Sequence, residues 1–537
     1  MANAQEEQLD LHPWRFSAPR ARRLTIALYS WESPGYGFVF SLVVALAFIV
    51  FCAGSPALLS LNPTLEMLAP VAQARALAAG SLSLTAIDAP FMAFLMMIAD
   101  IFVDTPGRIH LVAKALAAAA IALPFAFFMA VRFPTSHTIL FSAALAAFIC
   151  APFAGTAEIA LSYYVAFAVA MLCAPADETR IRAALEGTAS AVILFALWMT
   201  NPVFSLLGLL ALAACPFVSG RRGIDRYFAT ILVFAGIIAL SEVIFRGLNI
   251  ERADAVTEAF ALSSVFNKPA TGLVGVGVST LIVVFAAFVF GGREHWRSWA
   301  VSSVFILASF IAAIIVGANA MPLFVIGAAI ACLSVASPFY DGIFRAHDRA
   351  SIAISASVAA LTLFWTAAMV VHAGNQMVMQ IRVAGSAPNE IRAELGLVQP
   401  GGPAIARWIE EGRFSTPEAR ELLALAPVDH SMMLLDAAAR AKSIGGDTAE
   451  LAILTEADTG CVIADMHRQC AATGSAAASK ANIVFVPRID FSATTGAVKA
   501  SAEAMLYTDF KMIEQTPFWD VWVRREATIT SSPIGLE

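Results

Sequence analysis

The sequence predicts a polytopic α-helical membrane protein with a soluble α/β domain at its carboxyl-terminal end. Its 537 residues are 59% hydrophobic and only 14% charged, whereas a soluble protein has roughly 25% charged residues. Apolar runs of 16–24 residues recur from Phe38 to about Val371, and a bilayer core needs about 20 apolar residues. After Gly374 no run is long enough to span a membrane.

The amino-terminal segment 1–37 is polar or mixed and precedes the first apolar run. This run therefore does not resemble a cleaved signal peptide, and we expect it to remain as an anchor. The candidate spans are 38–58, 109–131, 136–153, 157–174, 185–200, 202–218, 227–246, 269–291, 298–317, 320–338 and 350–373.

Segment 90–104 is apolar but short, and Asp100 interrupts it. We expect an interfacial or re-entrant helix there, because a helix rises only about 1.5 Å per residue. This leaves about eleven spans, a number that the positive-inside rule can test.

Arginine distribution sets the expected orientation. One set of alternate loops holds most of the loop arginines, and these are Arg15, Arg20, Arg22, Arg23, Arg132, Arg180, Arg182, Arg221, Arg222, Arg226, Arg293, Arg297, Arg345 and Arg349. Since arginine-rich loops stay in the cytoplasm, we expect a cytoplasmic segment 1–37 and a transmembrane domain 38–373. Loop 55–108 of that domain and the soluble domain 374–537 then lie outside, which in a bacterium is the periplasm.

The soluble domain is expected to mix helices and strands. A helical pattern at "PVDHSMMLLDAAARAKSIGG" is followed by strand patterns at "ELAIL", "NIVFVPRIDF" and "FWDVWVRR". Cys461 and Cys470 are its only cysteines. In an oxidising compartment they can pair across a short loop, and the alternative is two unrelated thiols. His467 alone does not supply a metal site.

Several acids are expected at the outer face. Ionisable groups at membrane depth are costly, which makes Glu66, Asp88 and Glu158 candidate functional residues. A first-turn acid is the structural alternative for Glu66, and a helix cap is the alternative for Asp88. Glu158 lies in an apolar span near Tyr163 and Tyr164, so it needs water or a partner.

Glu242 and Arg246 end the span 227–246. They are either functional or an i,i+4 ion pair near the membrane interface. We consider both interpretations for this pair.

The segment "LEMLAPVAQARALAAG" (65–80) resembles the first extracytoplasmic loop of the GT-C membrane glycosyltransferases, of the protein O-mannosyltransferase and aminoarabinose-transferase type. Glu66 stands at the position of the family's Glu, Arg75 in its Ala-Arg, and Gly80 at its Gly. "DAPFMAFLMM" stands where the family's Pro-Pro-Leu helix begins.

Further segments extend the resemblance over about the first 220 residues and the tail. "TPGRIHLVAKALAAAAIALPFAFFMAVR" looks like the family's next span, and Glu158 stands at its acid at the outer end of a span. "RAALEGTASAVILFALWMTNPVFSLLGLL" is similar to its arginine-rich loop, span and Lys-Gly-Pro turn. "DFKMIEQTPFWDVWVRR" looks like its carboxyl-terminal hairpin. Three motifs depart from the pattern, since Leu65 replaces the family's Asp, Thr200-Asn201-Pro202 replaces its Lys-Gly-Pro, and Ala89-Pro90 replaces its double Pro.

The resemblance implies transfer of a sugar from a polyprenyl-phosphate donor to a periplasmic acceptor, which is a cell-envelope glycan, a lipid or a protein. We expect Glu66 as the general base, with Glu158 and Asp88 as the other acids. Candidate cations for donor binding are Arg75, Arg108, Arg246 and Lys268. Some relatives use a divalent metal, but the acids here are too dispersed to predict ligands for one.

Two other classes of function remain open. A catalytically inactive scaffold or assembly subunit of a membrane complex is favoured by Leu65 and Thr200. A transporter is less favoured, because it needs polar groups near the bilayer midplane and the spans are nearly all apolar there. No basic patch indicates nucleic-acid binding. We expect membrane lipids as partners and the bacterial inner membrane as the location. The alanine-rich composition with more arginine than lysine indicates a high-GC bacterium, in which the lipid carrier is expected to be of the undecaprenyl type.

Overall fold

The computed structural model describes residues 34–54, 65–87, 89–103, 106–133, 135–150, 155–173, 179–259, 296–329, 427–446, 449–455, 457–463, 470–471, 473–488, 495–516 and 519–525, with isolated positions between 277 and 371. The chain divides into two compact units. Unit 1 comprises Met1–Phe51 and Ala115–Ala373, and unit 2 comprises Cys52–Lys114 and Gly374–Glu537.

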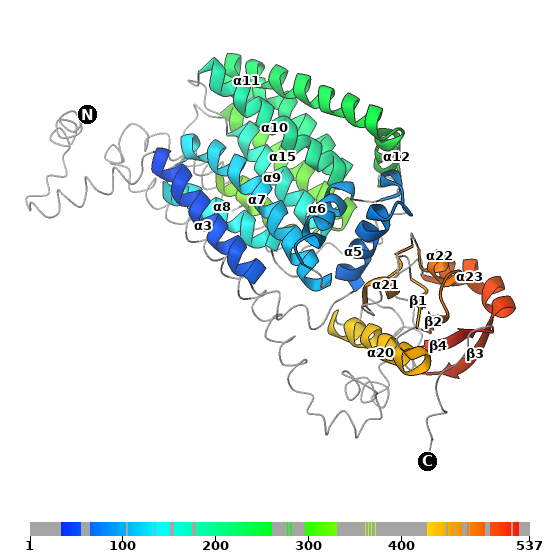
Figure 1. The fold of residues 1–537 in the computed structure, drawn as a ribbon. Helices are drawn as coiled ribbons and strands as arrows, with labels where there is room; N and C mark the ends of the chain where they lie inside the picture. Colours follow the sequence, from blue (N-terminus) through cyan, green and yellow to red (C-terminus); the bar gives the residue numbers. More distant parts are fainter. Residues whose placement is uncertain are drawn as a thin grey trace, which may run out of the picture. The chain divides into compact units, whose positions relative to one another are not determined.

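Unit 1 is a bundle of apolar helices (Figure 1). Its helices are α3 (Pro34–Gly54), most of α7 (Pro106–Arg132), α8 (Thr135–Cys150), α9 (Thr156–Leu172), α10 (Arg180–Thr200), α11 (Pro202–Ile244), α12 (Leu248–Ala259) and α15 (Trp296–Val316). Three described stretches, Ile109–Ala130, Arg180–Thr200 and Gly220–Ile244, are long and apolar enough to cross a membrane. The expected total of about eleven spans stays a prediction.

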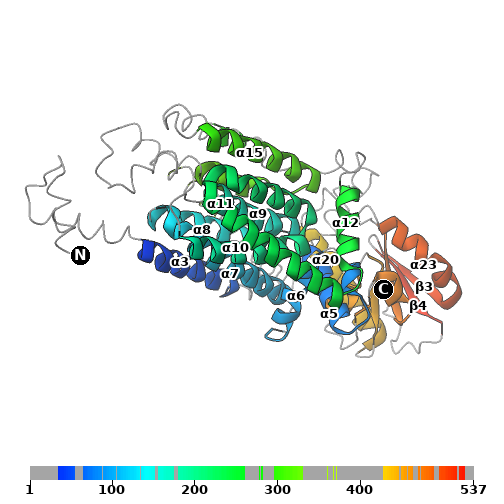
Figure 2. The same cartoon turned by 90° about the horizontal axis from the view of Figure 1, so that it is seen from above.

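α9 lies at the centre of unit 1, and every residue from Ile159 to Leu172 is buried. Helices α8, α10, α11 and α15 all pack against it, and Figure 2 shows α15 alongside α9 and α11. The two tyrosine hydroxyls of α9 are paired. Tyr163 donates to the carbonyl of Ala117 at 2.6 Å, and Tyr164 lies 2.8 Å from the Ser309 hydroxyl.

The expected break between spans 202–218 and 227–246 is present as a sharp kink at Gly220, where α11 (Pro202–Ile244) consists of two helices. Gly220 has a φ of 57°, a left-handed conformation that glycine tolerates. Past the kink, Gly223 lies so close to Cys215 that an added Cβ would be 2.5 Å from the Cys215 carbonyl oxygen. The arginines after Gly220 therefore lie on a helix.

Unit 2 joins the first-loop helices to the carboxyl-terminal domain. Its elements are α5 (Leu65–Ala78), η1 (Leu84–Ala86), α6 (Pro90–Asp100), α20 (Pro427–Gly445), β1 (Leu451–Ile453), α21 (Gly460–Ile463), α22 (Gly474–Ala478), β2 (Ile483–Pro487), α23 (Thr495–Asp509), β3 (Phe510–Gln515) and β4 (Trp519–Arg524). α5 packs on α6, α20 and α21, and the Ser81 hydroxyl donates to the Cys470 carbonyl at 2.8 Å. This partition differs from the expected one, in which loop 55–108 belonged to the membrane domain.

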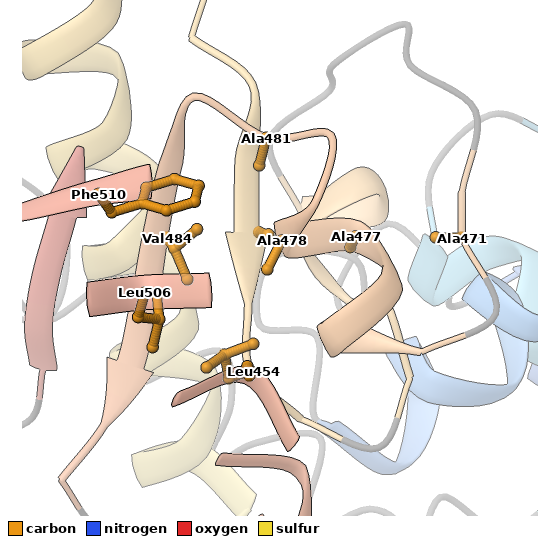
Figure 3. Packing of buried hydrophobic residues seen from close by; sticks show 10 residues of the cluster. Leu454, Ala471, Ala477, Ala478, Ala481, Val484, Leu506 and Phe510 are labelled. Carbon is orange, nitrogen blue, oxygen red and sulfur yellow. The ribbon is translucent and has the colours of Figure 1, made fainter. Parts of the chain in front are cut away.

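The domain contains one four-stranded sheet of order β1-β2-β4-β3. β1 and β2 are parallel, whereas β4 is antiparallel to both β2 and β3. The three strands expected from the sequence are present as β1, β2 and β4, and the segment resembling a hairpin forms the antiparallel β3–β4 pair. Ala477, Ala478, Leu506 and Phe510 pack against Val484 of β2 to form the core on one side of the sheet (Figure 3).

Candidate functional site

A group of charged side chains is buried inside unit 1. We call Arg132, Arg182, Glu186 and Arg226 the Glu186 cluster. The carboxylate of Glu186 accepts hydrogen bonds from Arg132 at 2.5 and 3.1 Å, from Arg226 at 3.1 Å and from Arg182 at 3.3 Å. The side chains of Glu186, Arg132 and Arg226 are at most 1% exposed. Three guanidinium groups thus share a single carboxylate.

Helix ends supply the remaining acceptors of the cluster. Arg132 is the last residue of α7 and donates to the carbonyl of Phe128 and, at 3.1 Å, to that of Ala170 near the end of α9. Arg182 donates to the Phe127 carbonyl at 3.1 Å. Cations are favourable at helix carboxyl termini, where carbonyls lack intrahelical partners. The cluster therefore joins the ends of α7 and α9 to α10 and α11.

The chemistry of the Glu186 cluster is structural. Arginine does not lose its proton in proteins, and the single carboxylate is occupied by the three guanidinium groups. The cluster also lies toward helix ends rather than at mid-helix, since Arg132 ends α7 and Arg182 is in the first turn of α10. Glu186 is not among the residues predicted from the sequence, although an acid inside an apolar span, four residues after an arginine, is a recognisable signal.

Glu158 has the partner that its position requires. One carboxylate oxygen accepts the backbone N–H of Gly155 at 2.9 Å, and the other accepts the backbone N–H of Asn319 at 3.0 Å. The first contact caps the start of α9, and the second fixes the turn that follows α15. Glu158 therefore joins two backbone segments of unit 1.

Glu242 does not form the i,i+4 pair with Arg246 that we considered. Its carboxylate accepts the backbone N–H groups of Gly247 and Asn249 at 2.7 and 3.1 Å, and the Asn249 amide at 2.9 Å. The Asn249 carbonyl accepts the indole N–H of Trp198 at 3.0 Å. Together these contacts tie α10, α11 and α12, whereas Arg246 is exposed in the turn between α11 and α12.

The first-loop residues lie in unit 2. Arg75 of α5 forms an ion pair with Asp100 at the end of α6, with Arg75 nitrogens 2.8 and 3.2 Å from the two carboxylate oxygens. Asp100, the acid that interrupts the apolar segment, thus anchors α6 on α5. Glu66 lies in the first turn of α5, where its position agrees with a first-turn acid.

Some predicted residues fall outside the described part of the chain. Asp88 and Lys268 are among them, and for Glu66 and Arg108 only the helical backbone is described. The structure therefore brings Arg75 together with Asp100. That Glu66, Asp88 and Glu158 lie close together stays a prediction. Within the described residues, no three His, Cys, Asp or Glu side chains lie close enough to hold a metal ion.

Cys461 and Cys470 form a disulfide. It links Cys461 in α21 to Cys470, which lies after α21 on the connection between β1 and β2. The Asp458 carboxylate accepts the backbone N–H of Ala471, the residue after Cys470, at 2.8 Å. A disulfide persists in an oxidising compartment and is rare in the cytosol.

No family model, no curated protein and no solved structure matches this chain.

Proposed function

We propose that this protein is a bacterial inner-membrane glycosyltransferase of the GT-C type. It transfers a sugar from a polyprenyl-phosphate donor to an acceptor of the cell envelope in the periplasm. The observation that carries the proposal is the packing inside unit 2. Helix α5 of the first loop bears Glu66, and it packs on α20 and α21 of the disulfide-containing domain. A base on α5 and an acceptor held by that domain would then belong to one compact body.

Unit 2 also supports the proposed orientation. The hydrogen bond between Ser81 and Cys470 supports a location of the first loop and the carboxyl-terminal domain on the same side of the membrane. An even number of spans then separates them, as in the proposed arrangement with about eleven spans and a cytoplasmic amino terminus. The disulfide favours the periplasm for this side.

The proposed reaction is a displacement at the anomeric carbon. The acceptor hydroxyl attacks this carbon while Glu66 takes the hydroxyl proton. The bond between the sugar and the phosphate breaks, its electron pair leaves with the polyprenyl phosphate, and the configuration inverts. Arg246 and Lys268 are the proposed partners of the leaving phosphate, whereas Arg75 positions α5 through Asp100.

The test uses protein reconstituted in liposomes with polyprenyl-phosphate mannose, glucose, arabinose or aminoarabinose and a cell-envelope extract as acceptor. Mass spectrometry measures the release of free polyprenyl phosphate. We expect release with at least one donor and a loss of about 100-fold or more in Glu66→Gln. Glu158→Gln is the comparison variant. Because Glu158 accepts hydrogen bonds from backbone N–H groups, this substitution should lower the stability more than the turnover rate.

An inactive scaffold subunit is the second candidate. It is favoured by the engagement of Glu158 with two backbone N–H groups and of Arg75 with Asp100, since polar groups that hold the fold are not free for a substrate. If no donor is consumed and Glu66→Gln leaves the cellular phenotype of the wild type unchanged, the scaffold replaces the enzyme.

A further inference from the structure

A groove of about 350 Å³ lies between α23 and the sheet in the carboxyl-terminal domain. It lies beside the core shown in Figure 3, and Leu506 belongs to both the core and the groove. Nothing in the proposed transfer reaction uses it.

Two aromatic side chains form an L-shaped wall of the groove. The rings of Tyr507 and Trp522 are perpendicular, with an interplanar angle of 88° and centroids 5.4 Å apart. They come from separate elements, α23 and β4. Tyr507 is 64% exposed, so its ring is available to a ligand rather than occupied by core packing.

Charged groups complete the lining. Lys499, Glu503 and Tyr507 follow each other at intervals of four residues and thus share one face of α23. Asp520 lies across the groove on β4, where the Gln515 amide donates to its carboxylate at 3.0 Å and Arg488 lies 3.8 Å away. These contacts fix the orientation of the Asp520 side chain from both neighbouring strands, since Gln515 is on β3 and Arg488 directly follows β2.

We propose that this groove binds a neutral carbohydrate. A sugar ring has an apolar C–H face, which packs on an aromatic ring, and a rim of hydroxyl groups, which donate to carboxylates and accept from an ammonium group. The wall of Tyr507 and Trp522 offers the first kind of contact, and Glu503, Asp520 and Lys499 offer the second.

Charge and size select this class of ligand. The lining has one lysine and two carboxylates, and even with Arg488 beside Asp520 it has no excess of positive charge, which disfavours phosphates and nucleic acid. The polar groups make a lipid tail a poor occupant, because a tail would take charged side chains away from water and offer them no hydrogen bonds. The volume is at the lower end of the range of small-molecule sites, about 300–1,000 Å³, and suits one or two sugar rings.

This inference goes beyond the proposed function, because the groove binds sugar whether or not the chain transfers one. The test uses the full-length protein in lipid nanodiscs, since maltoside detergents are themselves sugars. Saturation-transfer NMR is recorded with methyl glycosides of mannose, glucose, galactose, arabinose and N-acetylglucosamine, with glycerol as the polyol control. No donor is present, so failure of the transfer assay does not affect this readout.

We expect at least one glycoside to bind, with the strongest transfer to the protons on one ring face. Tyr507→Ala should weaken binding roughly tenfold, as expected for loss of an aromatic contact. Glu503→Gln should weaken binding to a smaller extent. Met512→Ala is the matched control, because Met512 is exposed on β3 and does not line the groove, and it should bind like the wild type.

Three results would overturn the proposal. The first is that no glycoside gives more transfer than glycerol at about 10 mM. The second is that binding is equal in the wild type and Tyr507→Ala, which would place the sugar elsewhere. The third is displacement of the glycoside by an unrelated peptide but by no other sugar, which would assign the groove to a peptide.

Discussion

Replacing Glu186 by glutamine removes the one carboxylate that three guanidinium groups share. The change keeps the shape of the side chain and one carbonyl oxygen. The other oxygen becomes an NH₂ group, which faces the N–H groups of arginines as donor against donor. We expect Glu186→Gln to be among the most destabilising single substitutions in unit 1.

The expected loss of stability in Glu186→Gln follows from the four hydrogen bonds that the carboxylate accepts. Each carboxylate oxygen accepts two of them, so the amide converts two of the four contacts into unfavourable ones. Hydrogen bonds to charged groups are each worth about 1.5–3 kcal/mol, which gives a loss of about 3–6 kcal/mol. Breaking a buried ion pair by removing one partner costs about 3–5 kcal/mol, in the same range.

The assay is thermal unfolding of the purified protein, compared between variants at one heating rate because unfolding of such proteins is often irreversible. We expect a fall in the apparent unfolding temperature on the order of 10 °C for Glu186→Gln. Arg180→Gln is the control, because Arg180 is 80% exposed and lies 3.5 Å from Asp225. A surface pair of this kind contributes about 0–1 kcal/mol.

A second substitution sharpens the test. Adding Arg226→Met to Glu186→Gln removes one of the buried charges left without a carboxylate, so the double variant should be more stable than Glu186→Gln alone. The reasoning is refuted if Glu186→Gln unfolds no earlier than Arg180→Gln, or if the second substitution destabilises the protein further.

Three other predictions concern packing and cross-links. Gly187→Ala should destabilise unit 1 by about 1–3 kcal/mol, because the added Cβ would lie 2.8 Å from atoms of α11. Gly236→Ala is the control, because its added Cβ would meet nothing within 4 Å. The two variants should differ in unfolding temperature, and equal unfolding temperatures would contradict the prediction. Cys461→Ser should lower the stability of the carboxyl-terminal domain by about 2–3 kcal/mol, because it opens a disulfide loop with a sequence separation of 9. Hydrogen exchange in β1 and β2 measures this loss, and unchanged protection of these strands would contradict the prediction. Asp100→Asn should weaken the partly exposed ion pair between Arg75 of α5 and Asp100 of α6 by about 1 kcal/mol or less, and should speed proteolysis between the two helices. A larger loss of stability, with global unfolding, would contradict this prediction.

The soluble domain shows what the sequence reveals of the fold. β1, β2 and β4 are predictable because their apolar side chains are buried, with the pattern alternating in β4. β3 was recognised only through the resemblance to a hairpin. Its residues after Phe510 are all exposed and include Lys511 and Glu514, which is typical of a protected edge strand and gives no alternating signal.

The charged residues of unit 1 show where reading the sequence fails. Arginines were used as markers of cytoplasmic loops, yet Arg132 and Arg226 are buried against Glu186. Spacing along one helix could have paired Arg182 with Glu186. The other two partners come from α7 and α11, and only the packing of the helices brings them to the same carboxylate.

Unit 2 is built from two segments that are far apart in the chain, so its parts are synthesised at different times. Ser81 and Cys470 are 389 residues apart in the chain, and translation adds about 5–20 residues per second. The first-loop helices therefore wait roughly 20–80 s for α20 and α21. During this time the face of α5 that packs on them is uncovered while the later spans are still being made. We therefore expect this face of α5 to be open to contacts with other proteins until α20 and α21 have been made.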